Sequence, residues 1–225
     1  MCYSVLVEQD LRRLFVDFDA LEDCAAFAHY SELQALDSKR YKPMSTHPRI
    51  YPQSFAPIIV ADEQQLLVKP MRYRLRPHGS AQEVPSKYNL FNARLEGLET
   101  RQTWSALFMR KHGLLVAQAF YEWVLRDGRK QVISFRPREH RDILIPVLYD
   151  EWEDPAGRET FASFALITGE PPPEVTEAGH DRCPLFLRRP YIETWLRPWQ
   201  ATRTRMKQLL TDREPAYFEH QNAEP

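Results

Sequence analysis

The chain has 225 residues and a mass of 26.6 kDa; 43% of the residues are hydrophobic and 27% charged, which is typical of one folded domain and excludes a disordered protein. The formal net charge of -1 excludes a general excess of positive charge, so any nucleic-acid binding must come from a local patch. Three cysteines cannot build a disulfide framework, no secretory signal opens the chain, and no apolar run approaches the roughly 20 residues of a membrane span. We therefore expect a cytoplasmic protein with no membrane partner.

The first part of the chain combines a helical pattern with proline-rich extended segments. Apolar residues recur at three- and four-residue steps, which predicts a helix over residues 8–37 with Cys24 in the core. The prolines of residues 42–57 indicate an extended loop, and strands are expected at 58–60 and 65–68. The helical stripe consists of Leu11, Leu14, Phe15, Phe18, Leu21, Phe27 and Leu33.

The middle of the chain carries the clearest β signal. Residues 114–125 and 130–135 are predicted to form a hairpin around the turn at 126–129. A short helix is expected before it, over residues 100–111, with Gly113 as its C-cap.

Further strands and helices complete the pattern. Two strands and two short helices are expected, in that order, at 143–149, 161–168, 191–196 and 201–210. The prediction is a single β-rich α+β domain over residues 1–211, with a curved or barrel-like antiparallel sheet and surrounding helices. Residues 212–225 are expected to be an acidic, frayed tail.

Cys2 is the residue with the most distinctive chemistry. Removal of Met1 would leave a thiol and a free α-amine on one residue, and such an aminothiol closes a five-membered thiazolidine ring on an aldehyde. The amine, with a pKa of about 7.7 to 8.0, and the thiol, at about 8.5, both keep a reactive fraction near neutral pH.

Three further segments stand in a fixed order behind Met1-Cys2. They are Asn92-Ala93-Arg94-Leu95-Glu96, Phe120-Tyr121-Glu122-Trp123 and His180-Asp181-Arg182-Cys183-Pro184. Together these segments resemble the SOS-response-associated peptidase (SRAP) family, whose motifs are Met-Cys, Asn-Ala-Arg-x-Glu, Phe-x-Glu-Trp and His-x-Arg-x-Pro. The resemblance extends from Met1 to about Trp199 and implies the SRAP fold.

Glu122 and His180 are the candidate acid and base. Glu122 lies in an apolar run, where desolvation would raise its pKa, although strand alternation alone favours an outward-facing glutamate. The resemblance implies a catalytic glutamate that helps to open a cyclic sugar to its aldehyde. His180 can move protons during imine chemistry, while a metal site with Cys183 lacks a second pair of ligands.

Asn92, Arg94 and Arg182 are the remaining motif residues with assigned roles. Asn92 is expected to orient the Cys2 amine, and the two arginines are expected to bind phosphate oxygens. The alternative for each arginine is a surface ion pair, with Glu96 or Asp181 as partner.

A second basic segment precedes these motifs. Arg72, Arg74 and Arg76 alternate with apolar residues, so an extended conformation would put three guanidinium groups on one face, as a track for a nucleic-acid backbone. A charged edge strand that resists aggregation is the alternative.

The chain departs from the family pattern at three places. The family's Tyr-Asn-x-Ala-Pro segment has no good match, and residues 51–57, Tyr-Pro-Gln-Ser-Phe-Ala-Pro, are its candidate remnant. Tyr3 and Ser4 follow Cys2 where the family has Gly and Arg, which removes one phosphate-binding arginine. The family's Trp-Gly-x-x-Pro segment is replaced by residues 71–77, Met-Arg-Tyr-Arg-Leu-Arg-Pro. These departures bear most directly on which DNA structure is bound.

The resemblance implies a protein that crosslinks covalently, through Cys2, to the opened aldehyde of an abasic site in single-stranded DNA during the DNA damage or SOS response. It also implies removal of Met1 by the chain's own active site, and a lyase activity is compatible with the same chemistry. Alternatives are a non-catalytic single-strand-binding module and an N-terminal-nucleophile peptidase acting on other amides. We expect no cofactor, no metal and no obligate protein partner, and association with the nucleoid when DNA is bound.

Overall fold

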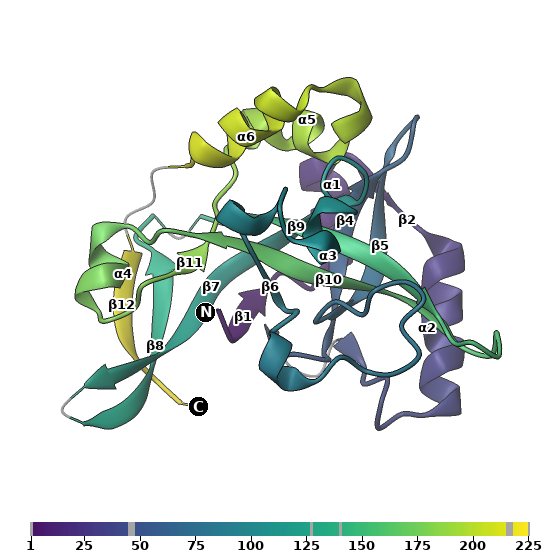
Figure 1. The fold of residues 1–225 in the computed structure, drawn as a ribbon, viewed down its shortest axis with the longest axis horizontal. Coiled ribbons are helices and arrows are strands. Elements are labelled where there is room, and N and C mark those ends of the chain that lie inside the picture. Colours follow the sequence, from purple (N-terminus) through teal and green to yellow (C-terminus); the bar gives the residue numbers. More distant parts are fainter. Residues whose placement is uncertain (1, 45–47, 127, 140, 215–217, 225) are drawn as a thin grey trace.

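A closed ring of five strands forms the centre of the molecule. The computed structural model describes residues 2–44, 48–126, 128–139, 141–214 and 218–224. The ring runs through β10 (Thr160–Gly169), β5 (Leu66–Tyr73), β4 (Phe55–Ala61), β7 (His112–Arg126) and β9 (Ile143–Glu153), which returns to β10 (Figure 1). The β10–β5 pair is parallel and the other four pairs are antiparallel. Closure leaves no exposed strand edge within the ring.

Strand β7 belongs to the barrel at one end and to a separate hairpin at the other. Its residues 112–117 pair with β9 inside the barrel. Its later residues pair with β1 (Ser4–Val7) and β8 (Arg129–Pro137). The second half of β7 is therefore held by the N-terminal strand and the hairpin, outside the closed ring.

Short strands and helices cover the outside. The remaining strands are β2 (Ala20–Glu22), β3 (Arg49–Ile50), β6 (Asn92–Arg94), β11 (Cys183–Pro184) and β12 (Phe218–Ala223). The α-helices are α1 (Leu11–Phe18), α2 (Cys24–Leu36), α3 (Gln102–Ser105), α4 (Pro173–Glu177), α5 (Ile192–Leu196) and α6 (Arg203–Thr211). Single 3-10 turns are η2 (Ser86–Tyr88), η3 (Leu95–Gly97), η4 (Arg189–Tyr191) and η5 (Pro198–Gln200). No helix of the described residues is long and apolar enough to cross a membrane.

The predicted fold class is confirmed, since helices surround a barrel-like sheet in one domain. The hairpin of β7 and β8, the strands at 143–149 and 161–168, and the helices at 191–196 and 201–210 are present with shifted ends. Asp127 of the predicted turn lies outside the described residues. Parallel pairs of β10 with β5 and β6, and of β2 with β5, make the sheet mixed instead of purely antiparallel.

The predicted helix over residues 8–37 is wrong as a single element. Asp19 adopts a left-handed conformation, with φ of 51°, and ends α1. Strand β2 follows and pairs with β5 before α2 begins. Cys24 is consequently exposed at the first turn of α2, and not in the core.

Four further expectations are corrected by the structure. Gly113 is a residue of β7 and not a helix cap, and a Cβ there would come within 2.7 Å of the Ile58 side chain. The predicted helix before it is only the four residues of α3. The frayed tail is wrong for residues 218–223, which form β12 against β8 because Phe218 packs on Phe120, with ring centroids 5.3 Å apart. The loop predicted at 42–57 contains β3 and the start of β4.

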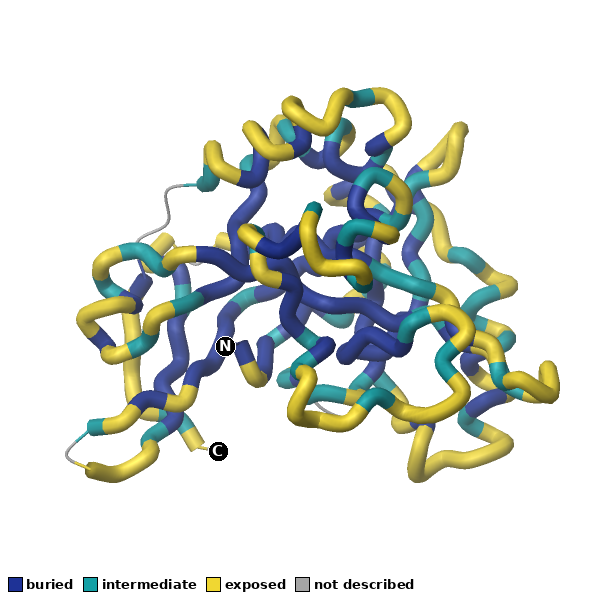
Figure 2. Tube along the Cα trace, in the orientation of Figure 1, coloured by how far each residue is buried: buried dark blue, intermediate teal, exposed yellow. Residues whose placement is uncertain are grey.

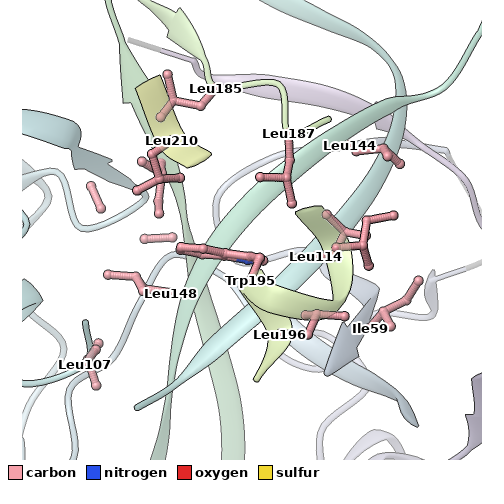
Figure 3. Packing of buried hydrophobic residues seen from close by; sticks show 14 of the residues in the cluster. Ile59, Leu107, Leu114, Leu144, Leu148, Leu185, Leu187, Trp195, Leu196 and Leu210 are labelled. Carbon is pink, nitrogen blue, oxygen red and sulfur yellow. The ribbon is translucent and has the colours of Figure 1, made fainter. Parts of the chain in front are cut away.

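The barrel and the C-terminal helices enclose a core centred on Trp195. Figure 2 shows the barrel strands buried over most of their length, and Figure 3 shows Trp195 among leucines from several elements. The Trp195 indole donates to the carbonyl of Gly113 (2.8 Å), and the His112 ring stacks on it with centroids 3.8 Å apart. His112 Nδ1 donates to the Trp195 carbonyl (2.8 Å), while its Nε2 accepts from the Met109 amide (3.1 Å). Burial lowers the pKa of His112 to about 3, so this histidine is neutral.

We predict that His112→Gln destabilises the protein at pH 7 by about 1–3 kcal/mol, since a buried hydrogen bond and a stacked ring are lost. Because the pKa of His112 is about 3 in the folded protein and near 6.5 when unfolded, its contribution is present above pH 6.5 and is lost as the pH falls towards 3. The stability difference between wild type and variant should therefore shrink by up to about 1.4 kcal/mol per pH unit below 6.5. Denaturant unfolding at several pH values measures this difference in the free energy of unfolding. His220→Gln, at an exposed histidine, is the control. A difference that does not change with pH would contradict a neutral, buried His112.

Candidate active site around Cys2

Cys2 is fully buried, directly before β1, where four strands meet. Its carbonyl oxygen accepts hydrogen bonds from the Tyr73 hydroxyl (3.0 Å) and from the Asn92 side-chain amide (3.0 Å). The Cys2 sulfur accepts a hydrogen bond from the backbone amide of Tyr121, and it lies 3.6 Å from the Ser4 carbonyl oxygen. Figure 1 shows the N-terminal strand between β6 and β7, which carry Asn92 and Tyr121. The structure therefore brings Cys2 and Asn92 together, through the Cys2 carbonyl.

The buried Glu122 and the partly buried His180 form a pair beside Cys2. Glu122 lies on the part of β7 outside the barrel and is only 1% exposed, so the outward-facing alternative is wrong; the next residue, Trp123, is the one that is exposed. His180 follows α4, and its Nε2 lies 3.3 Å from Glu122 Oε2. Gly179, directly before His180, has φ of 100° and packs so closely that a Cβ there would lie 3.7 Å from the Val124 side chain.

Burial sets the protonation of this pair. Desolvation raises the pKa of Glu122 to about 8, and the charge of Asp181 acts in the same direction, while the positive amino terminus opposes both. Desolvation also lowers the pKa of His180. His180 Nδ1 donates to the Arg182 carbonyl (2.7 Å), which leaves Nε2 as an acceptor. Near neutral pH, Glu122 is thus a carboxylic acid that can donate a proton to a neutral imidazole.

The thiols next to this pair are also desolvated. Burial raises the pKa of Cys2 well above its usual value, and the nearby Glu122 charge adds to the effect. Burial raises the pKa of Cys183 to about 12. Cys2 therefore carries a protonated thiol at rest. Among the described residues, no three His, Cys, Asp or Glu side chains are grouped so that they could hold a metal ion.

The two motif arginines differ in their surroundings. Arg182 makes a two-pronged ion pair with Glu96, with Nη1 3.0 Å from Oε2, so it has the ion-pair partner foreseen as the alternative. Arg94 is exposed on β6, two residues after Asn92. Within the described part of the chain, no carboxylate lies at ion-pair distance from Arg94.

The expected exposed arginine track is not present. Arg72, Arg74 and Arg76 are all buried. The Arg72 guanidinium lies 4.5 Å from the Phe161 ring centroid and pairs with Glu83, and that of Arg76 lies 3.4 Å from the ring centroid of Trp152. Arg74 donates to the carbonyl of Val84. The extended pattern fails because β5 ends at Tyr73 and Arg74, with φ of 90°, turns the chain.

A basic groove instead includes Asn92 in its lining. Its volume is about 770 Å³, and its lining includes Lys87, Arg94, Arg101 and the exposed Tyr88, with no acidic side chain among the described lining residues. The Arg101 stem packs against Gly97, where a Cβ would approach Arg101 Cδ to 3.0 Å. The sequence gives no signal for this groove, because its cations are spaced irregularly. Tyr73 was likewise missed, since nothing local indicates that it contacts Cys2.

Comparison with known proteins identifies the relatives of this chain. A family model described as SOS response associated peptidase (SRAP) matches residues 4–223. The abasic site processing protein YoqW of Bacillus subtilis is 24% identical over 195 residues, which cover 83% of this chain and 86% of YoqW. The abasic site processing protein HMCES of Xenopus tropicalis is 29% identical over 179 residues, covering 67% of this chain but only 52% of HMCES. Solved proteins from Bacteroides thetaiotaomicron (TM-score 0.74, 17% identity, 99% of this chain and 92% of that one) and Bordetella bronchiseptica (0.73, 19%, 100% of both) share the fold.

We predict that Glu122→Gln stabilises the protein at alkaline pH. The pKa of Glu122 is about 8 in the folded protein against 4.5 for a free glutamate, so its stabilising contribution is present below pH 4.5 and is lost as the pH rises towards 8. Glutamine does not titrate, so the stability of the variant should rise relative to that of wild type by up to about 1.4 kcal/mol per pH unit across that window. Thermal or denaturant unfolding from pH 4.5 to 8.5 tests this, with Glu63→Gln at an exposed glutamate as control. If the stability of wild type and of Glu122→Gln changed with pH in the same way, Glu122 would not be desolvated.

Proposed function

The chain belongs to the SOS response associated peptidase family, and on that premise we propose that it processes abasic sites in DNA by forming a thiazolidine crosslink through Cys2. The observation that carries this proposal is the convergence of the buried Cys2 with the Glu122–His180 pair and Asn92. The names of its relatives YoqW and HMCES, both abasic site processing proteins, agree with it.

The raised thiol pKa sets the order of the bond-forming steps. After removal of Met1, the Cys2 α-amine is the stronger available nucleophile, because its usual pKa is about 7.7 to 8.0 and the thiol is held protonated. The amine adds to the aldehyde carbon of the opened sugar and one water leaves, which gives an imine. The Cys2 S–H then adds across the C=N bond: sulfur bonds to carbon, and the thiol proton ends on nitrogen.

Glu122 and His180 supply the proton transfers. The closed sugar must first break its ring C–O bond, and a carboxylic acid that stays protonated near neutral pH can donate to the departing ring oxygen. The neutral Nε2 of His180 can accept the hydroxyl proton of the anomeric carbon as the aldehyde forms. Asn92 acts on Cys2 through its carbonyl, and not on the amine itself.

The groove beside Asn92 supplies a path for single-stranded DNA. Lys87, Arg94 and Arg101 present three positive charges to phosphates, and the exposed Tyr88 ring offers a surface on which a base can stack. Because Asn92 both lines the groove and donates to the Cys2 carbonyl, a strand lying in the groove would pass close to Cys2.

The same pair of residues would serve the removal of Met1, which lies outside the described residues. That step is hydrolysis of the Met1–Cys2 amide, in which water adds to the carbonyl and the Cys2 amine leaves with a proton. A catalytic acid and base near the amine are what this hydrolysis requires. The mass of the intact protein shows directly whether Met1 has been removed.

A non-catalytic single-strand-binding module is the second candidate. The complete burial of Cys2 favours it, since an aldehyde can reach the thiol only if the site opens. The two candidates differ in whether a Cys2-dependent covalent adduct forms.

We predict that Cys2→Ala abolishes the denaturant-stable adduct with abasic single-stranded DNA and leaves non-covalent binding nearly unchanged, because the phosphate-binding cations are separate from Cys2. Denaturing gels measure the adduct and fluorescence anisotropy measures binding. A residual adduct that needs borohydride would show an imine of the α-amine alone. An equally stable adduct from the alanine variant would refute the thiazolidine.

Glu122→Gln should slow crosslinking to a ring-closed abasic sugar by about 10²- to 10⁴-fold, the usual contribution of a positioned acid. An open-chain aldehyde on the same DNA backbone needs no ring opening and should be much less affected. The ratio of the two rates is the quantity to measure. Unchanged rates on both substrates would remove Glu122 from the mechanism.

Arg94→Ala and Arg101→Ala should each weaken binding to intact single strands and reduce the salt dependence of log K by about 0.7, the value for one lost phosphate contact. Arg12→Ala removes an exposed arginine from α1 and serves as the matched control. Arg182→Ala should have a smaller effect, because Arg182 must first leave Glu96. Equal salt slopes for wild type and both groove variants would exclude the groove as the binding path.

A further inference from the structure

We infer that Tyr73 positions Cys2 for closure of the thiazolidine ring, by holding the Cys2 carbonyl so that amine and thiol face the same carbon atom. This inference rests on the proposed function, and it assigns a role to a residue of the segment that replaces the family's Trp-Gly-x-x-Pro motif. Tyr73 does not touch the reacting atoms; it acts through the carbonyl of the residue that carries them.

The first argument is the saturation of the Cys2 carbonyl. A carbonyl oxygen has two lone pairs, and here Tyr73 Oη and Asn92 Nδ2 each donate from 3.0 Å. Both donors are buried. Two donors from different strands fix the direction of the C=O bond as well as its position. With the carbonyl group fixed, the Cys2 nitrogen and Cβ can move only by rotation about the Cα–C bond.

The second argument is that Tyr73 is itself held rigidly. Its ring stacks on Phe164 at 5.3 Å and meets the edge of Phe91 at 5.9 Å. Its backbone amide donates to Ser54 (2.8 Å), and its carbonyl accepts from Gln53 (2.7 Å). A hydroxyl on such a fixed ring can hold another group in place, which a flexible side chain cannot do.

The third argument is the strained turn that follows. Arg74 has φ of 90°, a conformation that favours glycine, yet its amide donates to the Phe164 carbonyl (3.0 Å) and its side chain to Val84. Strain of this kind persists only when surrounding contacts enforce it, and it gathers near functional sites. Here the turn stops β5 at the point where Tyr73 faces Cys2.

The fourth argument is the cost of a buried hydroxyl. Phenylalanine would fill the same space, whereas a buried tyrosine hydroxyl is unfavourable unless it is hydrogen-bonded. Among the described residues, the acceptor found for Tyr73 Oη is the Cys2 carbonyl. Burial raises the pKa of Tyr73 well above its usual value, so the hydroxyl remains a donor throughout the working pH range.

Ring closure is the step that needs this restraint. The imine forms with one group of Cys2, but closure requires the sulfur to reach the same carbon while nitrogen remains bonded to it. The sulfur stays near the Ser4 carbonyl and the Tyr121 amide, so the orientation of Cys2 decides whether both groups converge. Loss of the Tyr73 hydroxyl should therefore slow closure more than imine formation.

The test uses wild-type protein without Met1, confirmed by intact mass, and formaldehyde as a probe that needs no DNA. In Tyr73→Phe, the closed ring should form about 10- to 100-fold more slowly, and borohydride should trap more imine than in wild type. Tyr41→Phe is the matched control, because Tyr41 is also buried and donates to Glu159 (3.0 Å) in a separate cluster. A wild-type ratio of ring to imine in Tyr73→Phe would overturn the inference.

A second measurement does not depend on the folding of Tyr73→Phe. Site-specific 3-fluorotyrosine at position 73 keeps the ring and makes the hydroxyl a stronger donor, which should shift the ¹³C resonance of the Cys2 carbonyl. An unshifted resonance would overturn the inference. Abasic DNA is then added separately: if it gives no Cys2-dependent adduct while the formaldehyde and carbonyl results hold, the proposed function fails and the positioning role of Tyr73 stands.

Discussion

Burial of the carboxyl group of Glu122 is the constraint on which the arrangement of the site depends. A carboxyl group away from water is unfavourable in its charged form, so the site contains a proton that an exposed glutamate would have released. The surroundings that exclude water are the end of β7, the N-terminal strand and the His180 loop. The same exclusion keeps the Cys2 thiol protonated and His180 neutral. One physical cause therefore sets the state of all three groups, and the closed barrel supplies stability that offsets its cost.

The sequence predicted the motif residues of the site but not how they are oriented. Asn92, Glu122 and His180 are indicated by short motifs, and the structure places all three around Cys2. The orientation of Glu122 could not be decided by strand alternation, because residues 119–122 are buried without interruption and buried and exposed residues alternate only from Glu122 to Leu125. Which face is buried depends on β1, β8 and the His180 loop, and these contacts are distant in sequence.

The errors have a common origin in long-range contacts. The arginine track requires a strand that continues past Tyr73, but the chain turns at Arg74. The guanidinium groups of Arg72 and Arg76 are buried against aromatic rings, and that of Arg74 donates to the Val84 carbonyl. The charge of the tail predicts fraying, whereas Phe218 anchors it to the hairpin. Neither outcome can be read from residues nearby in sequence. Hairpins and long strands were predicted well because their signals are local.

The division of β7 between barrel and hairpin has a consequence for local opening. Amides of residues 112–117 are paired with β9 inside the closed ring, so they become exposed only when the barrel opens. Residues 120–126 pair with β8, whose other edge pairs with β12 in the part of the chain that the structure describes. Separation of that ladder breaks no pair of the barrel, and it forms a smaller cooperative unit. Because Cys2 lies against Tyr121 of this unit, we expect opening of the hairpin, and not of the barrel, to bring the buried cysteine into contact with solvent.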